Sequence, residues 1–214
     1  MAAQWLEVQL ASNKQRLLHS LGAYEKALEL AEQFACEPVA REQIGIASLL
    51  HDCAKLWSPM LLLQHAVEYQ LPLSDWDRLT PQTLHPFVGA HLVQQQFGIE
   101  DPVILDAIRY HTTARAGMRF VEKIVYLADK LEGNTRNPLF VQKVNRLLEF
   151  RNPASVDQAM LFLLDSTLQF LIEKQQIIHP RTAEARNDFV IRLKETRSVT
   201  NLAKPKLTPG AGQH

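Results

Sequence analysis

Apolar residues recur at intervals of three and four along most of the chain, the spacing that places side chains on one face of an α-helix. No segment shows sustained alternation of apolar and polar residues, the pattern of a half-buried β-strand, and no internal repeat is found. We therefore predict an all-α fold with a single helical domain. The predicted helices cover approximately residues 13–34, 38–58, 61–69, 81–97 (or 86–97), 102–111, 118–131, 154–175 and 182–195.

Local signals mark the ends of several predicted helices. Ser12 followed by Gln15 has the composition of a capping box for the first helix. Asp101, placed before a proline, is a suitable cap for the helix that begins at residue 102. Gly98 suits the position after a helix end, where the backbone often turns left-handed. Residues 72–81 are expected to form a loop.

The last residues differ in composition from the rest of the chain. Residues 198–214 contain Pro, Gly, Lys and Thr with few apolar side chains. Such a segment buries too little apolar surface to offset the entropy of ordering it. We expect a folded domain of residues 1–197 followed by a disordered tail.

The overall charge limits the partners of this protein. Its 214 residues include 23 Lys plus Arg and 23 Asp plus Glu, so no global positive field is available to hold a nucleic acid. No apolar run approaches the ~20 residues that span a bilayer, and the N-terminus lacks the pattern of a secretion signal. Cys36 and Cys53 form no disulfide framework. We expect a cytoplasmic protein without nucleic-acid or membrane partners; its oligomeric state is open, a homodimer included.

The pair His51-Asp52 places a nitrogen donor beside an oxygen donor at the end of an apolar run. Ile44, Ala47 and His51 share helical spacing, so His51 is expected on the buried face of the helix. An isolated charge in a protein core costs several kcal/mol or more. Either the helix turns Asp52 towards water, or a cation meets it inside the protein.

Two further residues favour the cation. His19 and Asp129 lie on other predicted helices, at or beside the apolar face, which is where a helical bundle builds a metal site. Histidine and carboxylate ligands without cysteine suit iron, manganese, zinc or magnesium better than a thiol-selected metal. Each histidine alone is more often structural than a ligand; the set favours a metal site. We assign no function to His65, His91, His179 and His214.

Four blocks of sequence extend the pattern. They are Leu49–Lys55, Leu84–Pro86, Ala107–Thr113 and Tyr126–Glu132. In this order, across about residues 12–190, they resemble the YqeK branch of the HD-domain metal-dependent phosphohydrolases, whose signature is H…HD…D. The resemblance implies an all-α HD-domain fold. It also implies iron-dependent, symmetrical hydrolysis of dinucleoside tetraphosphates, in which diadenosine tetraphosphate gives two ADP.

The resemblance also implies site residues, position by position. The metal ligands it implies are His19, His51, Asp52 and Asp129. His85 and His111 match two further histidines that either bind a second metal or contact substrate phosphates, and the sequence does not decide between these roles. One or two ions are therefore expected, with iron first and manganese, cobalt, zinc or magnesium as alternatives. Asp52 is the carboxylate that could bridge two ions.

Three basic residues, Arg16, Lys55 and Arg136, match positions near the substrate phosphates. Lys55 lies one helical turn after the His51-Asp52 pair, and Arg16 lies one turn before His19, so both are expected near the ligands. The loop after Asp129 departs from the family pattern, because Gly133 replaces a proline and Arg136 is shifted by one residue.

The implied chemistry needs a nucleophile and compensation of phosphate charge. A bound metal lowers the pKa of water from about 15.7 towards about 7, which provides hydroxide near neutral pH. Lys55 and Arg16 would offset the negative charge of a small anionic nucleotide, while the usual fate of such residues is solvated helix surface. We expect the catalytic residues to be Asp52, Lys55, His85 and His111, and the substrate contacts to include Arg16, His19, Lys55, His85, His111 and Arg136.

Two other functions compete with this one. The first is an HD phosphohydrolase with another nucleotide substrate. The chain lacks the Glu-Asp pair that we would look for after the dyad in an alarmone hydrolase, and the Gly-Tyr-Pro segment of the cyclic-dinucleotide branch. The second is a non-catalytic, nucleotide-binding helical module that keeps a metal for stability.

Overall fold

The computed structural model describes residues 2–133 and 137–202, without the side chains of residues 197 and 199–202. Within these residues the structure is helical and contains no strand, so the all-α prediction is confirmed. The elements are α1 (Ala2–Gln9), α2 (Lys14–Gln33), α3 (Pro38–Leu50), α4 (Pro59–Glu68), α5 (Asp75–Leu79), the 3-10 helix η1 (Pro81–Leu84), α6 (His85–Phe97), α7 (Pro102–Tyr110), α8 (Phe120–Leu131), α9 (Pro138–Leu148), α10 (Pro153–Glu173) and α11 (Pro180–Leu202).

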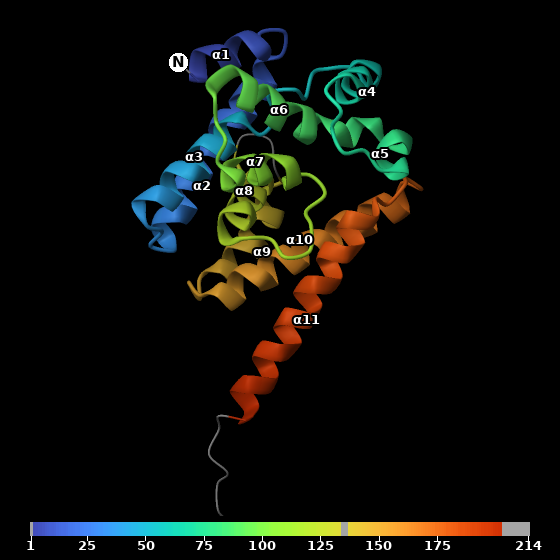
Figure 1. The fold of residues 1–214 in the computed structure, drawn as a ribbon. Helices are drawn as coiled ribbons and strands as arrows, with labels where there is room; N and C mark the ends of the chain where they lie inside the picture. Colours follow the sequence, from blue (N-terminus) through green and yellow to red (C-terminus); the bar gives the residue numbers. More distant parts are fainter. Residues whose placement is uncertain (1, 134–136, 203–214) are drawn as a thin grey trace, which may run out of the picture.

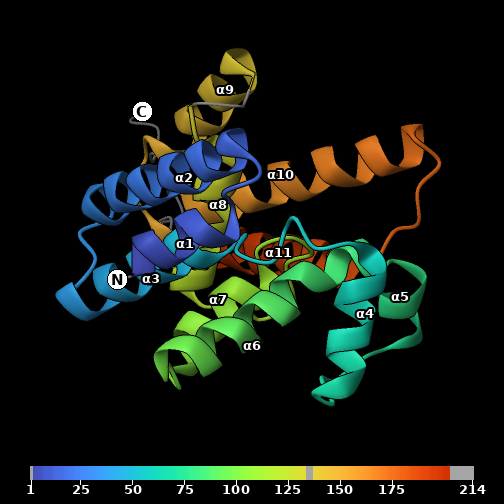
Figure 2. The ribbon, with the colours of Figure 1, turned by 90° about the horizontal axis from the view of Figure 1, so that it is seen from above.

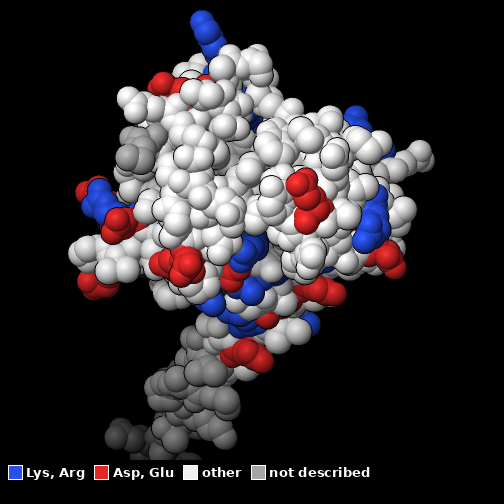
Figure 3. Space-filling view, turned by 45° about the horizontal axis from the view of Figure 1, so that its top comes forward, with Lys and Arg blue, Asp and Glu red and all other residues white. Residues whose placement is uncertain are grey.

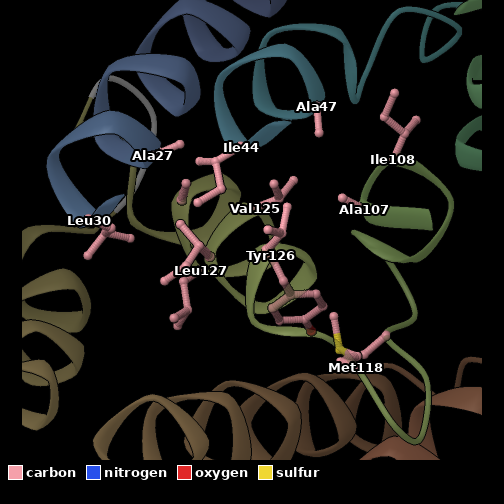
Figure 4. Packing of buried hydrophobic residues seen from close by; sticks show 14 of the residues in the cluster. Ala27, Leu30, Ile44, Ala47, Ala107, Ile108, Met118, Val125, Tyr126 and Leu127 are labelled. Atoms are coloured by element: carbon pink, nitrogen blue, oxygen red, sulfur yellow. The ribbon is translucent and has the colours of Figure 1, made fainter. Parts of the chain in front are cut away.

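Helix α8 is the centre of the fold. It is buried over almost its whole length and packs against α2, α3, α7 and α10 (Figures 1 and 2). Its Val125, Tyr126 and Leu127 lie among side chains from α2, α3 and α7 (Figure 4). Because burial of a large apolar side chain contributes about 1.5–3 kcal/mol, this cluster is the main source of stability in the domain. Asp129 is carried into the same core, one turn further along α8.

A second, smaller apolar cluster joins α4, η1 and α6. Its buried members are Ala54, Leu62, Ala66, Leu84 and Val88. This cluster fixes the start of α6, where His85 is located. Figures 1 and 2 show α4 and α5 beside α6, at the side of the main helical core.

The helix predicted for residues 38–58 is shorter than expected. Helix α3 ends at Leu50, and the chain continues in turns whose hydrogen bonds span three residues, for example from Lys55 N to Asp52 O. His51 Nδ1 donates to the carbonyl of Ser48 at 2.7 Å, and so competes for the acceptor that a continuing α-helix would use. Asp52 consequently lies beyond the helix rather than on it.

Residues 72–81 were predicted as a loop, and this was wrong for α5. Ser74 caps α5 by accepting from Asp77 N, and Asp77 receives the backbone N–H of Ser74 in return. The buried Asp77 carboxylate then accepts two hydrogen bonds from Arg181, at 2.9 and 2.7 Å. This pair fastens α5 to the start of α11.

Other helix ends and two whole helices also differ from the prediction. Asn13, not Ser12, caps α2, and its side chain accepts from Arg16 N. The prediction did not include α1 and α9. Helix α11 continues to Leu202, whereas its predicted end was near residue 195; residues 203–214 of the expected tail lie outside the described part. Gly98 follows α6 with a φ of 63°, as its sequence position indicated.

Among the described helices, none combines the length and apolar character required to cross a bilayer.

Candidate metal centre

Six of the predicted residues converge on one buried point of the main core. Each is at most 4% exposed. They come from α2, the turn after α3, the first position of α6, the turn after α7, and α8: His19, His51, Asp52, His85, His111 and Asp129. In the sequence, helical spacing placed three of these segments, those of His19, His51 and Asp129, at buried helix faces. The structure brings them together with the segments of His85 and His111.

The four histidines are oriented in the same sense. Three of them donate Nδ1–H to the backbone carbonyl three residues earlier: His51 to Ser48, His85 to Gln82 and His111 to Ile108, at 2.7–2.8 Å. The Nδ1 atom of His19 instead meets the buried carboxylate of Glu132 at 3.1 Å. Since a hydrogen bond of this kind fixes the tautomer, every Nε2 lone pair faces the centre.

Asp52 lies between two groups of ligands. Its Oδ2 is 3.7 Å from Nε2 of His19 and 3.7 Å from Nε2 of His51. Its Oδ1 is 3.2 Å from Nε2 of His85 and 3.3 Å from Nε2 of His111. The two oxygens of one carboxylate therefore face two separate pairs of imidazoles.

Asp129 completes the first group. Its Oδ1 lies 2.9 Å from Nε2 of His19 and 3.5 Å from Nε2 of His51. Donor atoms of these three side chains all lie within 4.8 Å of one another, and the same holds for His51, Asp52 and His111.

The donor set fits a divalent metal. The Nε2 atoms of His19 and His51 and Oδ1 of Asp52 are buried without a hydrogen-bond donor. Because Nδ1 carries the proton of each imidazole, acceptors face acceptors at the centre, which is unfavourable unless a cation lies between them. Imidazole nitrogen and carboxylate oxygen without thiolate are ligands for a divalent metal such as iron, manganese or zinc.

The pKa shifts agree with this reading. Burial by itself raises the pKa of Asp52, but the charge interaction with His51 and the contacts with His111 and His85 outweigh burial and hold that pKa well below its usual value. The pKa of Asp129 is likewise held low, against its burial, chiefly by Lys130. Burial lowers the pKa of His85, and lowers that of His111 to about 3. Ionised carboxylates and neutral imidazoles are the forms that bind a metal.

The pKa of His51 also indicates that positive charge is favoured at this centre. Its burial disfavours the imidazolium, but Asp52 and Asp129 outweigh that effect and raise the pKa. A divalent ion supplies this positive charge and displaces the proton.

Basic side chains surround the centre. Arg16 donates to Asp52 Oδ2 at 2.9 Å, Lys55 Nζ lies 3.1 Å from Nε2 of His85, and Lys130 Nζ lies 2.6 Å from Asp129 Oδ2. Arg16 and Lys55, about one third exposed, are accessible to an anion. Arg136, the third predicted basic residue, lies outside the described residues.

Three residues at the centre were not assigned from sequence: Thr112, Lys130 and Glu132. The Thr112 hydroxyl lies 3.0 Å from Nε2 of His111 and 3.3 Å from Nε2 of His85. Lys130 and Glu132 bind Asp129 and His19. All three belong to the sequence blocks that carry the family resemblance, and that position was the available signal.

Residues 16–134 match the family model described as the HD domain, which is more than half of the chain and includes all six converging side chains. The chain belongs to the HD-domain family. The resemblance found in the sequence is thereby confirmed at the level of the family, and the centre described above is the His/Asp cluster of this HD domain.

Relatives of this HD-domain protein cover most of its length. It is 37% identical over 167 residues to a protein of Bacillus subtilis (strain 168) named "Bis(5'-nucleosyl)-tetraphosphatase, symmetrical", which covers 78% of this chain and 85% of the relative. A protein of the same name from Halalkalibacterium halodurans is 34% identical over 84% of this chain and 91% of the relative.

A solved structure shares the HD fold. It is the crystal structure of a "predicted HD superfamily hydrolase involved in NAD metabolism" from Clostridium acetobutylicum. The TM-score is 0.80 at 31% identity, over 89% of this HD-domain chain and 96% of the other.

Proposed function

We propose that this HD-domain protein hydrolyses dinucleoside tetraphosphates symmetrically, so that diadenosine tetraphosphate and water give two ADP. The observation that carries the proposal is the complete ligand set, with six side chains directed at one buried point. Its support from similarity is the 37% identity to the B. subtilis relative of that name, over 85% of the relative's length.

We propose that the centre holds two divalent ions. His19, His51, Asp129 and Oδ2 of Asp52 would hold the first, and His85, His111 and Oδ1 of Asp52 the second. The opposed directions of the two Asp52 oxygens support this division. When bound, the metal lowers the pKa of water to supply a nucleophile and polarises the attacked phosphoryl group. Iron is proposed from the sequence resemblance; the same donors accept manganese, cobalt, zinc or, less well, magnesium.

The protein's own residues position the substrate. Arg16 can present two N–H groups to a phosphate, and Lys55 provides a compact positive charge 4.0 Å from Asp52 Oδ1. ADP is a good leaving group, so cleavage of the central anhydride bond needs no strong general acid. These basic groups beside the buried centre also suit a small anionic ligand. Figure 3 shows charges of both signs scattered over a largely uncharged face, with no continuous basic surface.

Product analysis tests the proposal. The protein would be loaded separately with Fe, Mn, Co, Mg or Zn and given diadenosine tetraphosphate, beside an Asp52→Ala control. We expect ADP as the only product, and no product from the control. AMP together with ATP would show asymmetric attack and refute the proposed reaction. Turnover of a different nucleotide, or binding without turnover, would favour the alternatives named above.

A cytoplasmic location is the remaining part of the proposal. Cys36 and Cys53 are both unpaired, which is in keeping with a reducing compartment. The oligomeric state, a homodimer included, is open, and light scattering of the purified protein can determine it.

A further inference from the structure

An apolar pocket of about 500 Å³ lies beside the metal centre, bounded by α8, α9 and α10. Two phenyl rings and two leucines are the apolar side chains of its wall: Phe140, Phe170, Leu163 and Leu171. Its volume falls in the range of small-molecule sites. Phe170 is 52% exposed, so this ring is available to a ligand from solution.

Two polar residues connect the pocket to the centre. Lys130 lines the pocket and binds Asp129 Oδ2, and Thr112 lines it and lies 3.0 Å from Nε2 of His111. One side chain therefore separates the pocket from each group of metal ligands. A ligand whose phosphates occupy the centre can extend directly into the pocket.

The lining favours a flat aromatic group over a polar one. The two remaining hydroxyls of the wall, Ser166 and Thr167, donate to the backbone carbonyls of Phe162 and Leu163. They therefore offer no free donor for the edge of a base. An adjoining pocket of about 440 Å³ shares Thr112, Thr167 and Leu171, but glutamines and threonines replace the phenyl rings there. Aromatic side chains stack with any nucleobase, because each base has a π-face.

We propose that the Phe140–Phe170 pocket binds one nucleobase of the substrate by stacking, with little discrimination between adenine and guanine. The inference rests on the proposed function, because it takes the metal centre as the place where the phosphates bind. It adds a base-binding residue, Phe170, and states which part of the nucleotide that residue contacts.

Calorimetric titration of the Mn²⁺-loaded protein distinguishes the contribution of the base to binding affinity from that of the phosphates. ADP, GDP and inorganic pyrophosphate would be titrated into the wild type, Phe170→Ala and Phe170→Trp. The matched control is Phe150→Ala, because Phe150 is 72% exposed and does not line this pocket. We expect Phe170→Ala to weaken ADP and GDP about 5-fold or more and to leave pyrophosphate unchanged. Phe170→Trp should retain nucleotide affinity, and Phe150→Ala should match the wild type.

Several results would overturn the inference. They are an unchanged ADP affinity in Phe170→Ala, an equal loss for pyrophosphate, or a wild type that binds ADP no better than pyrophosphate. A difference of more than about 10-fold between ADP and GDP would refute the low discrimination. The proposed function fails separately if the wild-type protein releases no ADP from diadenosine tetraphosphate. The titrations of ADP, GDP and pyrophosphate still test the pocket in that case.

Discussion

The Nδ1 atom of His19 lies 3.1 Å from Oε1 of Glu132, and the Glu132 side chain has no exposed surface. This contact joins α2 to the residue that follows α8 and determines which nitrogen of His19 faces the metal centre. We infer that Glu132 is a positioning residue that would act on a bound metal through His19, in the manner of the carboxylates that orient metal-binding histidines.

Substitution Glu132→Gln should weaken metal binding without unfolding the protein. The glutamine keeps the shape of the side chain but removes the charge that favours Nδ1–H, so we expect about 10-fold lower metal affinity. Competition with a fluorescent chelator measures the change. Glu25→Gln, at an exposed position of α2, is the matched control. Equal affinities for both variants would exclude the positioning role.

Substitution His111→Ala tests the number of ions. If His85 and His111 hold a second metal with Asp52, the variant should bind about one ion per chain where the wild type binds about two, with kcat reduced about 100-fold or more. Elemental analysis after removal of free metal gives the stoichiometry. An unchanged metal content with a raised KM would instead assign His111 to substrate phosphates.

Substitution Lys55→Ala should impair catalysis at intact metal content. Lys55 lies beside His85 and Asp52, and its partial burial lowers its pKa. Loss of one such preorganised positive group is expected to reduce kcat/KM about 100-fold. Lys26→Ala, which removes a lysine paired with Glu29 on the surface of α2, should leave kinetics unchanged. Similar kinetics for both variants would contradict a role for Lys55.

The Asp77–Arg181 pair should make the free energy of unfolding depend on pH in the acid range. Burial by itself raises the pKa of Asp77, but hydrogen bonds from His179, Arg181 and Ser74 outweigh it and place the pKa well below the usual value. The contribution of this carboxylate is therefore complete above the unfolded-state pKa of about 3.9 and is lost as the pH falls towards the folded-state pKa.

Asp77→Asn should lower the free energy of unfolding by about 3 kcal/mol at pH 7, because it leaves Arg181 without its buried partner. The difference from wild type should stay constant down to about pH 4 and narrow as the pH falls further. Urea denaturation across this range measures it. Asp165→Asn, which breaks the exposed pair with Arg186, should cost at most about 1 kcal/mol at any pH. A gap for Asp77→Asn that is constant with pH would argue against the assigned pKa shift.

The predictable part of the site came from local pattern. His19 and Asp129 lie at helical spacing with apolar neighbours, so their burial and their grouping with His51-Asp52 followed from the sequence, and the family resemblance then added His85 and His111. Glu132, by contrast, follows the last residue of α8 and is buried only because α2 brings His19 against it. No local pattern records a contact between residues that far apart.

The errors in the predicted fold have a similar origin. Asp75 and Asp77 made residues 72–81 resemble a loop, but Asp77 is buried by Arg181 from α11, more than a hundred residues later. The early end of α3 depends on the imidazole of His51, which donates a hydrogen bond to the Ser48 carbonyl. The spacing of apolar residues does not predict a hydrogen bond from a side chain to the backbone.

The ligands of the centre are spread over five segments between residues 19 and 129. Ions held jointly by these segments would close a loop of about a hundred residues, as a cross-link does, and would add their binding free energy to the stability of the fold. Metal supply would then affect the lifetime of the protein as well as its turnover. We expect a chain without its ions to open more often and to be degraded faster by proteases.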